Sequence, residues 1–305
     1  MIRETKDKYN NYSLDNICRL FGVSRQANFQ YLRNKLTIES KKELVIQHVL
    51  SIREYHPRIG TRKLYHMMQP FFNEHHISIG RDALFNLLAN EKLLIRTRIR
   101  KVTTTYSGHW MRKWPNLIKN YRVTAPNQLW VSDITYWKIN GEFLYISFIT
   151  DAYSRKIVGY SLSEHLDMKS TRNALLMALS ILNENHTGLI HHSDRGVQYC
   201  AMDYVKLLHK NNINISMTEN GDPKENAIAE RLNGIIKNEY LKKYKPKSFN
   251  QANFLLKRSV NLYNQERPHL SINLHTPDYT HHNKTKTYRK WKNYFRTNPV
   301  KVLQD

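Results

Sequence analysis

The sequence predicts a mixed α/β domain, a five-stranded sheet with flanking helices, behind a front that is all helical. Up to about residue 95, apolar residues recur at helical spacing with short turns between the runs. From residue 128 onward they alternate with polar residues, which is typical of strands. Three such runs come first, and strand and helix patterns then alternate. This order indicates antiparallel strands followed by parallel ones.

The charge balance points to a polyanionic partner. The 305 residues include 48 Lys and Arg against 25 Asp and Glu, a formal net charge of +23. A chain this basic attracts nucleic acid, with an anionic membrane surface as the rival partner. The basic residues are spread through the chain, and the sequence contains neither a membrane-spanning run nor the apolar core of a signal peptide. We therefore expect a nucleic-acid partner, no membrane partner, and a cytoplasmic location.

A helix-turn-helix is predicted within Tyr12–Lys35, and we assign 1–36 to it. Gly22 stands where the chain must turn, and Ser24 can cap the second helix. The second helix carries side chains of the types that read bases or phosphates, namely Arg25, Gln26 and Asn28. A helical hairpin without DNA contact is the alternative, and the net charge favours DNA.

Residues 40–98 predict a second helical DNA-binding unit. One helix continues to Tyr55, the segment "HPRIG" breaks it, and further helices begin at Thr61 and Arg81. Two helical units in tandem would read a longer DNA site than one.

A basic linker is predicted at 99–124. The wider stretch from Lys92 to Ser132 holds nine Lys and Arg but no Asp or Glu. Arg112 and Lys113 lie between two tryptophans there, which suits contact with a phosphate backbone. A solvated linker whose charges only aid solubility is the alternative.

The sheet is predicted within a catalytic core at 125–280, and a basic tail follows at 281–305. Asn140-Gly141 joins the first two strand-like runs and is a strong hairpin signal. A third run, "RKIVGYSL", is followed by the strands "GLIHHSD" and "INISMT" with helices between them. Further helices are expected near 226–241 and 250–265. This order of elements is the one found in RNase H-like domains.

Three carboxylates occupy positions that suit a site at the sheet edge. Asp133 lies in the middle of the first strand, where an acid is costly unless something positive faces it. Asp194 ends the fourth strand, where α/β sheets place their ligand sites. Glu230 points away from the apolar face of its helix at about 100° per residue. On the same side we place Asn226, Asn233 and Lys237.

Three converging carboxylates could hold two hard divalent cations, about 3.5–4 Å apart, for in-line displacement at phosphorus. Oxygen ligands favour Mg²⁺, with Mn²⁺ possible, over zinc. Cys18 and Cys200 are too few for a four-thiolate zinc site. Any one of the acids alone could equally be a cap or a turn residue, so the interpretation depends on all three.

The nearby histidines and a fourth acid are not predicted to be ligands. His191 and His192 are adjacent on a strand and point to opposite faces, so they cannot both join Asp194 around one ion. Packed or hydrogen-bonded histidines are the expectation. Asp151, which ends the second strand, is expected to form a turn.

These motifs resemble a known family. "WVSDIT", "HSDRGVQY" and "NGDPKENAIAERLNGIIKNE" are similar to the catalytic motifs of retroviral-integrase-like DDE transposases of bacterial insertion sequences, of the OrfB type. Between Asp194 and Glu230 lie 35 residues, matching the DD(35)E spacing of that group. "GTRKL" (Gly60–Leu64) and "YNQERPHLSINLHTP" (Tyr263–Pro277) resemble two further motifs of the group.

The resemblance implies roles for individual residues. Asp133, Asp194 and Glu230 would be both the catalytic residues and the ligands of two Mg²⁺ ions. Gly196 would allow close backbone approach and Gln198 would lie beside the site. Candidate DNA contacts at matching positions, or in the basic patches, are Arg62, Lys63, Asn226, Lys237 and Arg267.

The resemblance also implies an activity and partners. The activity would be metal-dependent cleavage at the inverted-repeat ends of a transposon, followed by attack of the freed 3′-hydroxyl on target DNA. The partners would be double-stranded DNA, further copies of the chain in a homo-oligomer, and an upstream OrfA-type product. A bacterial, nucleoid-associated setting follows. The chain departs from the family in having "GDPKEN" where "GNPYDN" is common, and it lacks the zinc-binding module of retroviral integrases.

Two other functions stay open at this point. The chain could be a non-catalytic DNA-binding repressor or a domesticated transposase relative. It could also be a nuclease that does not join strands. Three acids facing phosphates favour an enzyme, because binding alone does not need them.

Overall fold

The computed structural model describes residues 1–95, 110–119, 121–139, 141–182, 186–219 and 223–285. The chain divides into two compact units. The first comprises Met1–Glu54 and Met68–Leu94. The second comprises Tyr55–Met67 and the chain from Ile95 onward. Residues 99–109 and 120 of the predicted basic linker lie outside the described residues.

The first unit is helical, as predicted. Its elements are α1 (Ile2–Lys8), α2 (Leu14–Leu20), most of α3 (Arg25–Tyr55), α5 (Gln69–Glu74) and α6 (Arg81–Asn90). The turn between α2 and α3 confirms the sequence-based prediction, because Gly22 has φ of 69° and the Ser24 hydroxyl accepts a hydrogen bond from the Ala27 amide at 3.0 Å. His48 of α3 stacks on Phe71 of α5, with ring centroids 4.0 Å apart.

Helix α3 differs from the sequence-based expectation, because it continues through the expected boundary between the two helical units. It spans 31 residues without a break. The stretch 36–41, "LTIESK", contains no glycine or proline, so nothing in it terminates a helix. The side chains of Val45 and Val49 in α3, and of Leu84 and Leu88 in α6, are buried.

The second unit contains the predicted mixed sheet. Its five strands are β1 (Leu129–Ile139), β2 (Glu142–Asp151), β3 (Ile157–Ser163), β4 (Ile190–Ser193) and β5 (Asn214–Met217), in the order β3-β2-β1-β4-β5. The first three strands pair antiparallel, and β1–β4 and β4–β5 pair parallel. The hairpin between β1 and β2 is confirmed, with Gly141 at φ of 95°. Asn140 lies outside the described residues.

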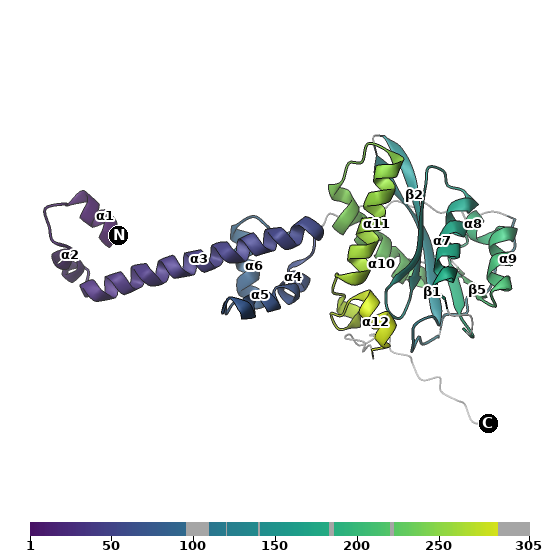
Figure 1. Cartoon of the computed structure of the whole chain (residues 1–305), viewed down its shortest axis with the longest axis horizontal. Helices are drawn as coiled ribbons and strands as arrows, with labels where there is room; N and C mark the ends of the chain where they lie inside the picture. The colour runs from purple at the N-terminus through teal and green to yellow at the C-terminus, as the bar shows by residue number, and fades with distance from the viewer. Residues whose placement is uncertain (96–109, 120, 140, 183–185, 220–222, 286–305) are drawn as a thin grey trace, which may run out of the picture. The chain divides into compact units, whose positions relative to one another are not determined.

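Helices cover both faces of this sheet (Figure 1). On one face lie α7 (Met168–Ser180), α8 (Val197–Cys200) and α9 (Met202–Lys210); on the other lie α10 (Ala227–Ile235) and α11 (Phe249–Gln265). Alternation along β1 divides its side chains between two cores. Trp130 and Ile134 pack with the first set of helices, and Trp137 packs with the second set.

Smaller elements complete the second unit. They are α4 (Thr61–Met67), a 3₁₀ turn at Pro223–Asn226, a 3₁₀ turn at Leu270–Ile272 and α12 (Pro277–Asn283). The helix expected at 226–241 is not uniform, because α10 passes into a π turn at Ile236–Tyr240 and then into a 3₁₀ turn. A π turn fits an extra residue into the helix and changes which side chains face inward. Within the described residues, no helix has the length and apolar character that crossing a bilayer requires.

Candidate active site

Asp133 and Asp194 lie level with each other on neighbouring strands. Strand β4 pairs with β1 over Leu129–Val131, and its last partner couple is Val131 and His192. Asp133 lies two residues after Val131 in β1. Asp194 lies two residues after His192, directly after the end of β4. In the described part of the chain, β1 beyond Val131 pairs with β2 alone, and at its other edge the Ser132 carbonyl accepts from Asn226 Nδ2 at 2.9 Å.

Asp133 is held by two donors and faces two other acids. Its Oδ1 accepts from the Ile134 amide at 2.9 Å, and its Oδ2 accepts from Asn233 Nδ2 at 2.8 Å. Burial raises the pKa of Asp133 to about 8, and the negative charges of Asp194 and Glu230 add to the increase against the two hydrogen bonds. Three acids from two strands and a helix therefore interact electrostatically at one sheet edge.

Glu230 lies in the first turn of α10, and its side chain is exposed. Leu232 and Ile235 of the same helix are buried, so the predicted helical faces are confirmed for these residues. Across the described residues, no three His, Cys, Asp or Glu side chains come close enough together to ligate one metal ion. The three acids thus share a neighbourhood without forming a closed set of ligands.

The loop after β4 brings Gly196 against Asp194. The Gly196 amide donates to Asp194 Oδ1 at 3.0 Å. A Cβ at Gly196 would lie 3.1 Å from that same oxygen and 3.2 Å from Gln198 Oε1, so a larger residue would crowd both side chains. The Gln198 amide donates in turn to the Leu166 carbonyl at 3.3 Å. Gly196 and Gln198 therefore lie beside Asp194.

His191 and His192 are hydrogen-bonded parts of the scaffold. His191 Nε2 bonds with the Tyr204 hydroxyl at 2.9 Å, and His192 bonds with the Ser216 hydroxyl at 2.8 Å and the Glu225 carbonyl at 3.1 Å. Burial lowers the pKa of His191 to about 3 and that of His192 to about 4. Both rings are therefore neutral near pH 7.

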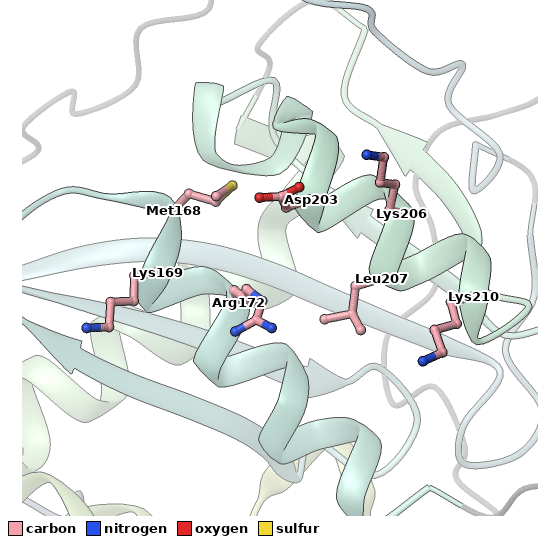
Figure 2. A pocket seen from close by; sticks show the side chains of 7 residues that line it. All are labelled: Met168, Lys169, Arg172, Asp203, Lys206, Leu207 and Lys210. Carbon is pink, nitrogen blue, oxygen red and sulfur yellow. The ribbon is translucent and has the colours of Figure 1, made fainter.

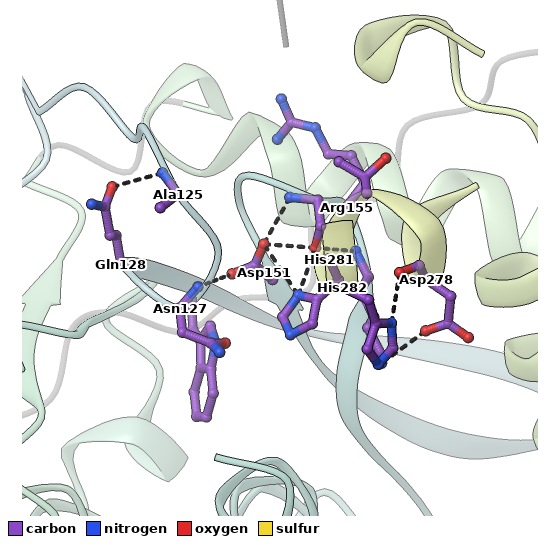
Figure 3. A network of polar contacts seen from close by, with 12 residues as sticks. Ala125, Asn127, Gln128, Asp151, Arg155, Asp278, His281 and His282 are labelled. Carbon is purple, nitrogen blue, oxygen red and sulfur yellow. Dashed lines mark hydrogen bonds and ion pairs between the residues drawn. The ribbon is translucent and has the colours of Figure 1, made fainter. Parts of the chain in front are cut away.

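Asp151 has the role of a turn residue, as expected (Figure 3). Its side chain is fully buried at the end of β2. Oδ2 accepts from the Asn127 amide, and Oδ1 accepts from both the amide and the hydroxyl of Ser154, each at 2.7 Å. His281 of α12 also bonds with the Ser154 hydroxyl at 3.0 Å. Hydrogen-bond donors thus surround this carboxylate and fix the turn into β3.

Models of the integrase core domain match residues 123–223 and 211–277, which span the sheet and its three acids. The solved catalytic core domain of HTLV-2 integrase, described as a complex with magnesium, is similar to 53% of this chain. That match covers 100% of the solved domain at 23% sequence identity and a TM-score of 0.43.

Two relatives match over most of their length. The chain is 33% identical to the 31 kDa protein of insertion element IS600 from Shigella sonnei, over 83% of this chain and 93% of that protein. It is 30% identical to the transposase of insertion sequence IS629 from the same organism, over 70% of each chain. The chain belongs to the insertion-sequence transposases that carry an integrase core. The family and function predicted from the motifs are thereby confirmed.

Several cations that were predicted to contact DNA are exposed in this transposase. They are Arg25, Arg62, Arg112 and Lys113, and Gln26 is also exposed. Lys237 is half-buried, and its ammonium lies 3.9 Å from the centre of the Tyr136 ring on β1. Burial lowers the pKa of Lys237. Asn28 is 9% exposed, which leaves its side chain little access to DNA.

Asn226 and Arg267 have structural partners instead of the predicted DNA contacts. Asn226 is buried and its Nδ2 donates to the Ser132 carbonyl of β1 at 2.9 Å. Arg267 is 3% exposed and donates to both carboxylate oxygens of Glu239, at 2.8 and 2.9 Å. Both side chains are buried and donate to acceptors of the protein, so the predicted DNA contacts of these two residues lack structural support.

Glu239 joins two of the sequence motifs, which sequence reasoning did not anticipate. Lys63 of "GTRKL" lies 3.1 Å from Glu239 Oε1, and Arg267 of the C-terminal motif binds the same carboxylate. Burial and, after it, the charge of Arg267 lower the pKa of Lys63 to about 8 against the opposing effect of Glu239. Burial opposes ionisation of Glu239, but hydrogen bonds and charges from both cations outweigh it and lower its pKa. Lys63 is therefore a structural cation that connects α4 with Glu239 and Arg267 within the second unit.

Asn233 was also missed as a site residue. Helical arithmetic places it on the same side as Glu230, yet it is buried and donates to Asp133. The sequence did contain a sign of this role. Asn233 follows Glu230 by three residues and so lies on the same side of the helix, and its amide is a donor that a buried acid such as Asp133 requires.

Proposed function

We propose that Asp133, Asp194 and Glu230 bind the divalent cations with which this transposase cleaves and joins DNA. The observation that carries the proposal is the buried carboxyl of Asp133, which faces two further acids and so calls for positive charge. Because all three donors are carboxylate oxygens, the ligand set fits Mg²⁺ or Mn²⁺ better than zinc.

Hydrogen-bond donors around the acids support this role by fixing the orientation of the carboxylates. The Ile134 amide and Asn233 hold the two oxygens of Asp133, and the Gly196 amide holds one oxygen of Asp194. When bound, two such cations supply Lewis-acid activation of the attacking oxygen and stabilisation of the leaving 3′-oxygen. Carboxylates that are held in place before the reaction lower its reorganisation cost.

The proposed substrate is double-stranded DNA, both the transposon ends and the target. The exposed cations Arg25, Arg62, Arg112 and Lys113 can neutralise the phosphates of such a duplex. Transposition requires both ends of the transposon to be held together, and this favours a homo-oligomer in which more than one copy of the chain binds an end. An upstream OrfA-type product that recognises the ends is a further proposed partner.

The test uses the purified full chain with labelled inverted-repeat ends and Mg²⁺. We expect cleavage and joining by the natural protein and a loss on the order of a thousandfold or more in Asp194→Asn, with DNA binding retained. Glu142→Gln, an exposed acid at the start of β2, is the matched control and should react normally. Undiminished Mg²⁺-dependent cleavage by Asp194→Asn would refute the proposed ligand set. Binding of the ends without any cleavage would instead favour a non-catalytic end-binding protein.

A further inference from the structure

A pocket of 580 Å³ lies between α7 and α9, on the face of the sheet that α10 and α11 do not cover (Figure 2). Seven residues line it: Met168, Lys169, Arg172, Asp203, Lys206, Leu207 and Lys210. Asp133 is bonded to Asn233 of α10, which packs against the other face. The pocket is therefore separate from the candidate active site.

Four of the lining residues are cations, and one is an acid. Lys169 and Arg172 are three residues apart on α7, and Lys206 and Lys210 are four apart on α9, so each helix presents two cations on one face. In the view of Figure 2, Arg172 lies between Lys169 on one side and Lys210 on the other. All four side chains are exposed.

Within the part of the chain that the structure describes, these four cations form no ion pair, and Asp203 is the one acid among the residues that line the pocket. None of them makes a salt bridge there, in contrast to Lys63 and Arg267, which share Glu239. Two like charges on one helix face destabilise that helix slightly. Lys210, in the last turn of α9, is favourable for the helix dipole, but helix stability does not explain why each helix carries a pair of cations, whereas an anionic ligand does.

We propose that the pocket between α7 and α9 binds the phosphate backbone of double-stranded DNA without reading its sequence. The proposal rests on the proposed function, because it assumes a protein that acts on DNA. The cations come in two pairs on two helices, an extended arrangement that suits successive phosphates better than one small anion. Apart from the four cations and Asp203, the lining side chains are apolar, and no amide, hydroxyl or aromatic ring stands among them.

Sequence-independent contact is what target DNA requires of a protein that inserts at many sites. The duplex next to a transposon end presents the same phosphate backbone as target DNA, so either of these two duplexes could bind the pocket by the same chemistry. An experiment with a random-sequence duplex and an inverted-repeat duplex can tell them apart.

The test variant of the full chain carries Lys169→Gln, Arg172→Gln, Lys206→Gln and Lys210→Gln. The control variant carries Lys242→Gln, Lys243→Gln, Lys245→Gln and Lys247→Gln, four exposed lysines on the segment after α10. Both variants lose four positive charges, so general electrostatic attraction changes equally. Binding to each duplex is measured over a series of salt concentrations.

We expect the test variant to bind the random duplex at least about tenfold more weakly, with the slope of log affinity against log salt reduced by about 3–4. The control should change the slope by less than about 1. Weakening on the random duplex alone identifies target DNA, and weakening on both duplexes identifies a backbone contact common to both. Equal effects of the two variants, or an effect on the inverted-repeat duplex alone, would overturn the proposal.

Failure of this inference differs from failure of the proposed function. The test variant should still cleave inverted-repeat ends with Mg²⁺ at saturating protein, whereas Asp194→Asn should not. Conversely, Asp194→Asn should keep the full salt dependence of binding to the random duplex. A natural protein that does not cleave at all would count against the active site while leaving the pocket result intact.

Discussion

Asp133 and Asp151 lie on paired neighbouring strands, β1 and β2, yet their surroundings are opposite. Asp151 accepts hydrogen bonds from the Asn127 amide and from the amide and hydroxyl of Ser154. Asp133 has two donors but also faces the charges of Asp194 and Glu230, and burial raises its pKa to about 8. One acid is surrounded by hydrogen-bond donors, whereas the other lies near two further acids. What faces a carboxylate decides its role.

The largest expected effect comes from Asp133→Asn. Removing this ligand should reduce cleavage of inverted-repeat ends on the order of a thousandfold or more. The free energy of unfolding without Mg²⁺ should stay equal or rise, because the substitution removes the cost of burying a carboxylate and also its repulsion with the other acids. Cleavage assays and urea denaturation measure the two quantities. A variant that unfolds more easily and still cleaves would mean that Asp133 has a structural role, like Asp151.

Glu239→Gln extends the comparison to an acid that faces cations. Lys63 and Arg267 would be left with uncompensated charge in a mostly buried site, so we expect a loss of about 3–5 kcal/mol in the free energy of unfolding. The control is Glu219→Gln, which breaks an exposed pair with Lys119 and should cost less than about 1 kcal/mol. Similar losses in both variants, measured by urea denaturation, would contradict a structural role for this cluster.

Asp151→Asn should lower the free energy of unfolding and leave DNA cleavage unchanged. The amide can accept hydrogen bonds with one oxygen alone, so at least one buried donor loses its charged partner, at about 2–3 kcal/mol. Urea denaturation measures the loss. Cleavage per folded molecule should be close to that of the natural protein, and a thousandfold defect would mean that Asp151 belongs to the active site.

His191 gives the smallest effect, and it depends on pH. Its pKa in the folded protein is about 3, below the usual 6.5, so the folded state resists protonation. Its contribution to stability is complete above pH 6.5 and is lost as pH falls from there toward about 3. We expect His191→Gln to remove about 1.4 kcal/mol per pH unit from the slope of unfolding free energy between pH 6 and pH 5. An unchanged slope would mean that the ring is not held neutral.

Much of this molecule could be predicted because local rules act within short stretches of chain. Gly22 and Ser24 define a turn and a cap, and the alternation after residue 128 defines strands. Asp133, Asp194 and Glu230 could be named as candidate ligands because few residue types bind hard cations and their motifs suggest a common sheet edge.

Other features could not be predicted, because they depend on which elements meet. Asn226 and Asn233 share a helical face by arithmetic, yet one binds a strand carbonyl and the other binds Asp133. The contact of Glu239 with Lys63 and Arg267 joins three distant segments, beside a π turn that no spacing rule predicts. The pocket between α7 and α9 likewise needs two helices to lie side by side.

By itself the sequence determined the elements, the basic character of the chain and the three acids of the catalytic motifs. Periodicity reports how a side chain points relative to the axis of its own helix or strand. It does not report what stands opposite. Only the tertiary structure decided that Lys63 and Arg267 share an acid while Lys169, Arg172, Lys206 and Lys210 line an open pocket. The physical reason is that burial and the facing charge set the state of an ionisable group, and both arise from packing between elements.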